Sequence, residues 1–170
     1  MTGPTTEQRR LRWLNDLPDD QAVGELLVVC HSRRWATQVA AGRPYADVAE
    51  LQRAADEVWT GLDPDDWREA FEAHPRIGER GGGSADWSKQ EQAGVGAAGE
   101  GVQAAIAHGN AEYEDRFGHV FLISAAGRSA EAILANLRAR LGNDPDTELR
   151  VAAEEHRRIT RLRIERLMQG

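Results

Sequence analysis

The residues best suited to chemistry begin with a histidine, in the run His74-Pro75-Arg76-Ile77-Gly78. Asp63 and Pro64 are typical of a helix N-terminus, and that helix must end before Pro75, because a residue that precedes proline is pushed out of the helical conformation. The imidazole of His74 is therefore expected at a helix C-terminus, where the dipole favours the protonated ring by a few tenths to about 2 kcal/mol. A proton donor and a simple C-terminal cap both fit this placement.

A second polar group follows in the run Ser88-Lys89-Gln90-Glu91-Gln92. Ser-x-x-Glu is the pattern of a capping box at a helix N-terminus. Such a terminus presents unpaired N–H groups, here beside a hydroxyl, a carboxylate and an amide. The cluster is suited to a ureido or imide-like ligand that carries both donors and acceptors, and a purely structural cap explains the same residues.

An arginine stands on the apolar stripe of the last predicted helix. At about 100° per residue, the stripe with Arg163 also holds Leu149, Ala152, His156, Ile159 and Leu167. A guanidinium keeps its proton, so a core-facing Arg163 needs an anion or costs several kcal/mol. A ligand anion, a structural ion pair and a stem that reaches water all remain open. His156 is expected to be a hydrogen-bonded core residue.

The segment from Phe117 to Ser129 is apolar and β-branched in its middle and is punctuated by glycine. It is too short for a good helix, so we expect it to cross the core as extended chain, with Ser129 capping the next helix. Buried backbone needs hydrogen-bond partners, which neighbouring side chains or a ligand can supply. An isolated strand or an ordinary connection between helices is the alternative.

Helical periodicity dominates the rest of the chain, which predicts an all-α, single-domain bundle of about seven to nine helices. The turn residues Gly42-Arg43-Pro44, Gly61 to Pro64 and Gly142 to Pro145 separate the predicted helices. These are expected over 9–15, 19–41 (with a break), 46–61, 64–73, 89–115, 129–141 and 146–168. Residues 1–8 are expected to form a flexible tail, residues 9–170 a single domain, and the glycine-rich stretch 78–87 a surface loop.

Composition excludes several classes of protein. The 170 residues are 41% hydrophobic and 29% charged, which is ordinary for a globular protein, and the net charge of −7 argues against nucleic-acid or membrane-surface partners. Cys30 is the single cysteine, so a disulfide framework is excluded and a reducing cytoplasm is expected. No run is apolar enough for a membrane span or a signal peptide, and the five histidines lack metal-ligand spacing, so no metal is expected.

Together these segments resemble the OHCU decarboxylases, which act in uric acid degradation on 2-oxo-4-hydroxy-4-carboxy-5-ureidoimidazoline (OHCU). The resemblance extends from about Leu14 to Leu167. Its motifs are Leu14-Asn15, Cys30, Trp35, Arg43-Pro44, Trp59, Trp67, Phe71, His74 to Gly78, Ser88 to Gly94, Asn110, Tyr113, Phe117-Gly118, Phe121 to Ser129 and Ile159 to Arg163. Each motif is weak alone, but the ordered set is specific.

The resemblance implies an all-α fold, a homodimer and a decarboxylation to (S)-allantoin and CO2 without metal or organic cofactor. It assigns His74 as the proton donor, Glu91 and Arg163 as further catalytic residues, and Arg161 as a rival to Arg163. Its implied substrate-binding residues are Pro75, Ser88, Gln92 and the backbone segment Phe121, Leu122, Ile123, Ser124 and Ala125.

Two positions depart from the family pattern. The family often has an aromatic or hydrophobic residue where His119 stands, and a cysteine where Ser124 stands. Neither departure removes a catalytic group, although both concern the lining of the pocket. Two other functions remain as alternatives: a non-catalytic module that binds a protein partner through its acidic surface and tryptophans, and a hydrolase or isomerase of a related ureide.

Overall fold

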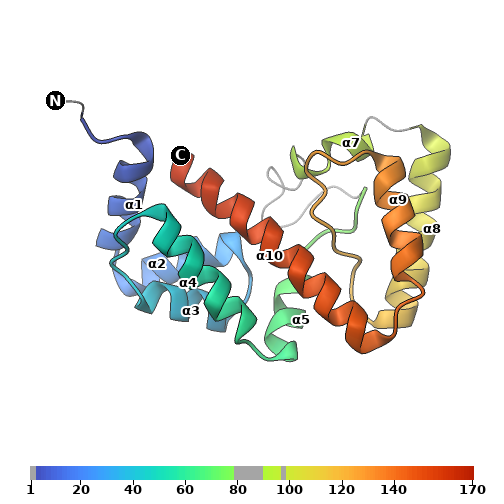
Figure 1. Cartoon of the computed structure of the whole chain (residues 1–170), viewed down its shortest axis with the longest axis horizontal. Helices are drawn as coiled ribbons and strands as arrows, with labels where there is room; N and C mark the ends of the chain where they lie inside the picture. Colours follow the sequence, from blue (N-terminus) through green and yellow to red (C-terminus); the bar gives the residue numbers. More distant parts are fainter. Residues whose placement is uncertain (1–2, 79–89, 97–98) are drawn as a thin grey trace. The chain divides into compact units, whose positions relative to one another are not determined.

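The computed structural model of the chain describes residues 3–78, 90–96 and 99–170 (Figure 1), and within them all regular structure is helical. The all-α prediction is therefore confirmed. The helices are α1 (Thr6–Asp16), α2 (Asp19–Val29), α3 (Arg33–Ala41), α4 (Val48–Thr60), α5 (Pro64–Glu72), α7 (Ala93–Gly96), α8 (Glu100–Phe117), α9 (Ala130–Arg140) and α10 (Pro145–Gln169). They form two compact units, one of Met1–Ala70 with Ile159–Gly170 and one of Phe71–Arg158.

Most predicted boundaries lie within two residues of those observed, with two corrections. α1 begins at Thr6, inside the range predicted as a tail, because Thr5 and Gln8 form a reciprocal capping box. The single helix predicted over 89–115 is wrong. Gly99 has extended backbone angles and serves as the N-cap of α8, so α7 and α8 are separate helices.

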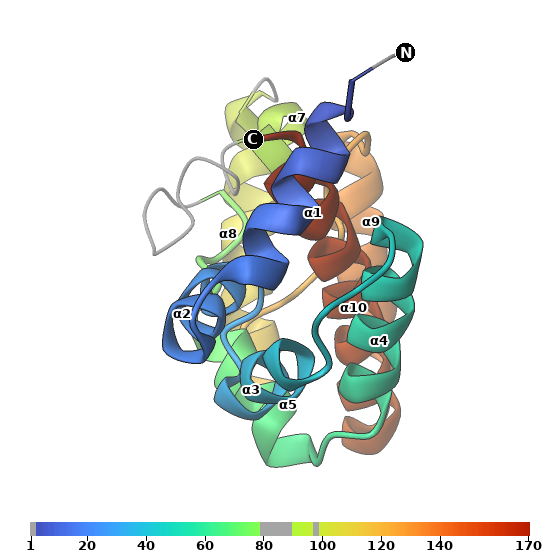
Figure 2. The same ribbon diagram turned by 90° about the vertical axis from the view of Figure 1, so that its left-hand side faces the viewer.

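In the first unit, α2 packs on α3 and α3 packs on α4 (Figure 2). The sequence motifs of this half hold the connections between helices. The amide of Asn15 exchanges two hydrogen bonds of 2.9 Å with the backbone of Tyr45. The guanidinium of Arg43 donates to the carbonyl oxygens of Leu14 and Leu17 at 2.7 and 2.8 Å. These motif residues are therefore structural.

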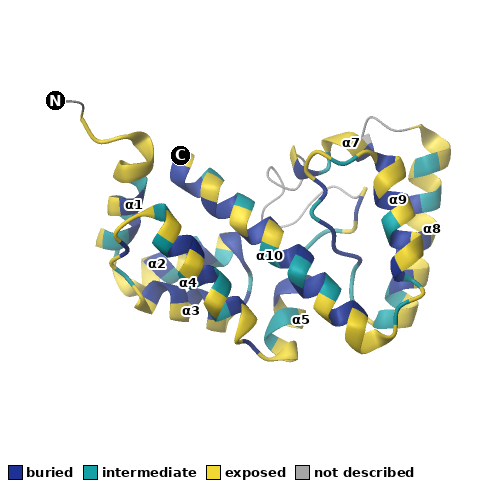
Figure 3. Cartoon of the chain, in the orientation of Figure 1, coloured by how far each residue is buried: buried dark blue, intermediate teal, exposed yellow. Residues whose placement is uncertain are grey.

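The last part of α10 completes the core of this unit. Arg10 donates to the carbonyl oxygen of Leu167 at 3.0 Å, and Gln52 of α4 donates to that of Arg161 at 2.9 Å. The buried stripe of this helix, visible in dark blue in Figure 3, includes Ile159, Thr160, Arg163, Ile164, Leu167 and Met168. The prediction that Arg163 faces the core is confirmed.

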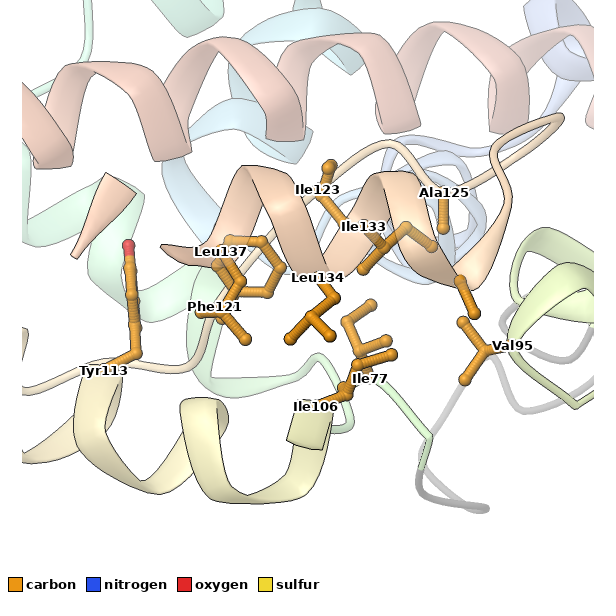
Figure 4. Packing of buried hydrophobic residues seen from close by; sticks show 11 residues of the cluster. Ile77, Val95, Ile106, Tyr113, Phe121, Ile123, Ala125, Ile133, Leu134 and Leu137 are labelled. Carbon is orange, nitrogen blue, oxygen red and sulfur yellow. The ribbon is translucent and has the colours of Figure 1, made fainter. Parts of the chain in front are cut away.

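The second unit is organised around α8 and α9, which lie side by side. One hydrophobic cluster fills this unit, and it collects side chains from segments far apart in sequence (Figure 4). Ile77 comes from the loop after His74, Val95 comes from α7, and Phe121, Ile123 and Ala125 come from the non-helical segment before α9. The cluster thus brings together three of the segments that the sequence singled out.

Gly94 is the point where α7 approaches the chain before α9. A Cβ at this position would lie 2.5 Å from the carbonyl oxygen of Arg128, a backbone atom that can move only with its segment. We expect Gly94→Ala to lower the free energy of unfolding by about 1–3 kcal/mol, as overpacking does. Gly101→Ala is the control, because a Cβ there meets nothing within 4 Å and helix propensity favours alanine by up to about 1 kcal/mol. Urea denaturation measures both, and equal stability of the two variants would contradict the close approach.

Candidate active site

His74 closes the last turn of α5. That helix begins at Pro64, as predicted, and ends at Glu72, and the backbone N–H of His74 donates to the carbonyl oxygen of Phe71 at 3.0 Å. The imidazole is half-buried, and it meets the fully buried ring of His156 edge-on, with 4.9 Å between ring centroids. The predicted position at a helix C-terminus is confirmed, as is the burial of His156.

The loop after His74 is fixed at two points. Gly78, at φ +93°, donates its backbone N–H to Oε1 of Gln92 at 2.7 Å, which ties the loop to the residues just before α7. Asn110 of α8 is buried and donates to the carbonyl oxygen of Ile77 at 3.0 Å. Asn110 therefore positions this loop, a role that the sequence did not predict. Asn110 and Ile77 are 33 residues apart, so no local pattern indicates their contact.

Glu91 lies in a helical turn next to Gln92 and is 7% exposed. A carboxylate at this depth is unusual unless it has a partner or a function. Because Gln92 is bound to Gly78, Glu91 belongs to the same part of the second unit as the His74 loop. Ser88 lies outside the described residues, as does most of the predicted loop over 78–87, so the proposed capping box stays a prediction.

The segment Phe121–Ala125 is non-helical and almost completely buried, as expected of extended chain that crosses the core. Side chains supply its backbone partners. Arg140 of α9 donates from Nη1 to the carbonyl oxygen of Leu122 at 2.6 Å, and Glu155 of α10 accepts from the N–H of Ser124 at 3.0 Å. The contact at Ser124 uses the backbone, so the exchange of the family's frequent cysteine for serine leaves it intact.

A buried network of charged side chains binds the segment Phe121–Ala125. The guanidinium of Arg140 also donates from Nε to Glu148 at 2.8 Å, and its Cζ lies 4.5 Å from the ring centroid of Phe121. Glu148 is fully buried and accepts further hydrogen bonds from the hydroxyl of Tyr113 and from Asn143. Burial and the hydrogen bond to Glu148 raise the pKa of Tyr113, so this phenol stays a neutral donor.

His119 lies in an aromatic cluster of the second unit. Its ring centroid lies 5.3 Å from that of Phe71, 5.5 Å from Tyr113 and 6.4 Å from Phe117. One ring nitrogen lies 3.1 Å from the carbonyl oxygen of Val120. The position where the family often has an aromatic or hydrophobic residue is therefore filled here by a ring that packs against other rings of the second unit.

Arg163 belongs to the first unit and is 1% exposed. The charge of Arg163 acts on Cys30 and on His31, and Thr160 forms a hydrogen bond with the Cys30 side chain. Burial raises the pKa of the Cys30 thiol to about 12, which leaves it a neutral packing residue. Burial and the charge of Arg163 lower the pKa of His31. Arg161 is exposed instead and pairs with Asp56 at 3.4 Å, so burial distinguishes the two arginines.

Neither a membrane-spanning helix nor a metal-binding cluster occurs in the described residues. Every helix there is too short or too polar to cross a lipid bilayer. In the same residues, no group of three or more histidine, cysteine, aspartate or glutamate side chains is placed to hold a metal ion.

Comparison with known proteins decides the family. The sequence model of OHCU decarboxylase matches residues 15–165. This chain belongs to the OHCU decarboxylase family. A crystal structure of OHCU decarboxylase in the presence of (S)-allantoin has a TM-score of 0.77 and 31% identity, covering 86% of this chain and 98% of that one.

Two curated relatives of this chain give the same result at the level of sequence. The 2-oxo-4-hydroxy-4-carboxy-5-ureidoimidazoline decarboxylase of Amia calva is 33% identical over 79% of this chain and 79% of its own length. The uric acid degradation bifunctional protein TTL of Arabidopsis thaliana is 33% identical over 84% of this chain, which spans only 46% of that protein.

Proposed function

We propose that this chain decarboxylates OHCU to (S)-allantoin and CO2. The observation that carries the proposal is the shared hydrophobic cluster of the second unit. It packs Ile77 beside the His74 loop, Val95 beside Glu91 and Gln92, and the segment Phe121–Ala125. His74, Glu91, Gln92 and the segment Phe121–Ala125, which are part of the set to which the family resemblance assigns substrate contacts, thus adjoin one core. The relative crystallised with (S)-allantoin supports the same reaction.

The substrate itself can accept the electrons that a cofactor would otherwise take up. When the bond to the carboxylate breaks, its electron pair passes into the adjoining C=N–C=O system of the ring and CO2 leaves. One proton must then reach the ring carbon that becomes the stereocentre, and the neighbouring hydroxyl must give up its proton to become the carbonyl of allantoin. The protein therefore has to orient the scissile bond, stabilise negative charge on the ring and deliver a proton to one face.

Each proposed role follows from a described environment or from the family resemblance. His74, at the end of α5, donates the proton to the ring carbon, with Pro75 beside the ligand. Glu91 accepts from the substrate hydroxyl or ureido N–H. The amide oxygen of Gln92 is engaged by Gly78, so its N–H2 group is the end that donates to a substrate carbonyl. Ser88 keeps the binding role that the resemblance gives it.

Arg163, and not Arg161, is proposed to hold the anionic or carbonyl oxygens of the substrate. The test compares Arg163→Met with Arg161→Met, which each remove one guanidinium and keep an unbranched apolar stem. We expect kcat/KM for OHCU to fall about 10²- to 10³-fold in Arg163→Met, the loss typical of a group that stabilises developing charge. Arg161→Met should retain wild-type kinetics, since its partner Asp56 is a surface contact. The reverse ranking in steady-state assays would assign the role to Arg161.

We further propose that residues 9–170 act as one decarboxylase domain, because the family model matches residues 15–165, a range that includes parts of both compact units. A homodimer and a cytoplasmic location are proposed as well. The family resemblance supports the dimer, and the single cysteine supports a reducing compartment. Light scattering of the purified protein tests the dimer, which a monomer mass at micromolar concentration would exclude.

The reaction itself is tested with freshly generated OHCU that carries ¹³C in its carboxylate. Carbon NMR should show label leaving as CO2 and bicarbonate, far faster with the protein than without it. Label retained in a ring-opened product would indicate a ureide hydrolase. An unaltered background rate would favour a module that only binds partners.

A further inference from the structure

A buried carboxylate outside the residues assigned so far lies against the substrate-binding segment. Glu155 of α10 is 6% exposed, and its Oε2 accepts from the backbone N–H of Ser124 at 3.0 Å. Its other oxygen lies 3.4 Å from Arg158 and 3.7 Å from Arg128, both partly exposed. The two arginines compensate the charge of Glu155, which would otherwise be costly to bury.

Among the described residues, side chains hold the segment Phe121–Ala125 along one edge only, and the carbonyl oxygen of Ala125 at its end accepts from the backbone N–H of Arg128 at 3.0 Å. In extended chain, the N–H and C=O groups of alternate residues point to the same side and those of the residue between them to the other. Arg140 donates to the carbonyl oxygen of Leu122 and Glu155 accepts from the N–H of Ser124, so both hydrogen bonds lie on one edge. The N–H and C=O of Ile123 point to the opposite edge. Neither has a hydrogen-bond partner within the part of the chain that the structure describes.

Both side chains that hold this edge depend on α10: Glu155 lies on it, and Arg140 is bound by Glu148 of the same helix. Glu148, which binds Arg140, and Glu155 are seven residues apart and so lie on one face of the helix, two turns from each other. Phe121, Ile123 and Ala125 turn their side chains into the core cluster, which fixes the segment's rotation. Among the described residues, Glu155 is the only charged group that accepts a hydrogen bond from a backbone N–H on this edge.

We propose that Glu155 is a positioning residue for the substrate. Through Ser124 it sets the place of the free N–H and C=O of Ile123, a donor and acceptor pair that matches the adjacent C=O and N–H of a cyclic ureide. The inference rests on the proposed function and adds a residue to it that does not touch the substrate. A carboxylate suits this task because charge-assisted hydrogen bonds are shorter and stronger than neutral ones.

Two substitutions separate reach from charge. Glu155→Asp keeps the charge and withdraws the acceptor from Ser124 by one methylene, whereas Glu155→Gln keeps an oxygen at the same distance without the charge. We expect Glu155→Asp to raise KM for OHCU and the Kd for (S)-allantoin about 10-fold, the effect of losing one hydrogen bond to a charged group. Its kcat should change less than about 3-fold, because the reacting groups remain in place. Glu155→Gln should raise both constants only about 3-fold, because a neutral hydrogen bond at the same reach is roughly half as strong as a charge-assisted one.

Glu154→Gln is the matched control. Glu154 is the neighbouring, partly exposed residue of α10, paired with Arg157 at 2.7 Å, and its replacement should leave KM and Kd unchanged. Thermal unfolding of all variants separates folding from binding. An unchanged KM and Kd in Glu155→Asp, or a lower melting temperature with no change in either constant, would overturn the positioning role. Absence of CO2 release by the wild-type protein would instead overturn the proposed function, and this role with it.

Discussion

Replacing His74 by asparagine is expected to lower kcat for OHCU about 10²- to 10⁴-fold, the contribution typical of a positioned general acid. Asparagine has a similar size and keeps a hydrogen-bonding group at the end of α5, but it cannot deliver a proton to carbon. The backbone hydrogen bond from residue 74 to Phe71 and the anchors at Ile77 and Gly78 are independent of the imidazole. The fold should therefore persist, and steady-state kinetics measures the loss.

The control for this variant is His108→Asn. His108 is an exposed histidine of α8 whose imidazole pairs with Glu112 on the same helix. It should keep wild-type kinetics and a wild-type melting temperature. If His74→Asn turned over OHCU at nearly the wild-type rate and with full stereospecificity, the proton donor would have to be another group.

The largest effect on stability is expected at Arg140. Arg140→Met removes the only charge that pairs with the fully buried Glu148 among the described residues, and it also releases the carbonyl oxygen of Leu122. Breaking a buried ion pair from one side typically costs about 3–5 kcal/mol, because the remaining charge is left uncompensated. Urea denaturation at neutral pH should show this loss in the free energy of unfolding.

Two further variants locate the cause. Arg138→Met, an exposed position two residues earlier on α9, should change stability by no more than about 0.5 kcal/mol. The double variant Arg140→Met with Glu148→Gln should recover part of the loss, since no buried charge then remains unpaired. If the double variant were as unstable as the sum of both single variants, the pairing would not be the source of the stability.

The sequence was most informative where local chemistry determines structure. Pro64 and Ser129 marked the starts of α5 and α9 because a fixed φ and a capping hydroxyl act on adjacent residues. The prediction of one helix over 89–115 failed for a complementary reason. Gly99 takes extended backbone angles and caps α8, and Gly94 in α7 packs against the carbonyl oxygen of Arg128, more than thirty residues away; no local periodicity encodes either feature.

The candidate site divides in the same way. The apolar stripe of the last helix was enough to predict that Arg163 is buried, and Pro75 was enough to place His74 at a helix end. Glu148 and Glu155 gave no such signal. They stand in a helix rich in glutamate and arginine, which is typical of a solvated face. Their partners Arg140 and Ser124 become visible only once the chain is folded.

Circular dichroism during turnover of freshly generated OHCU tests most directly whether this protein protonates a single face of its substrate. The account predicts that the signal of (S)-allantoin grows in step with CO2 release, and that the product is one enantiomer. A racemic product formed at the rate of the spontaneous reaction would contradict it.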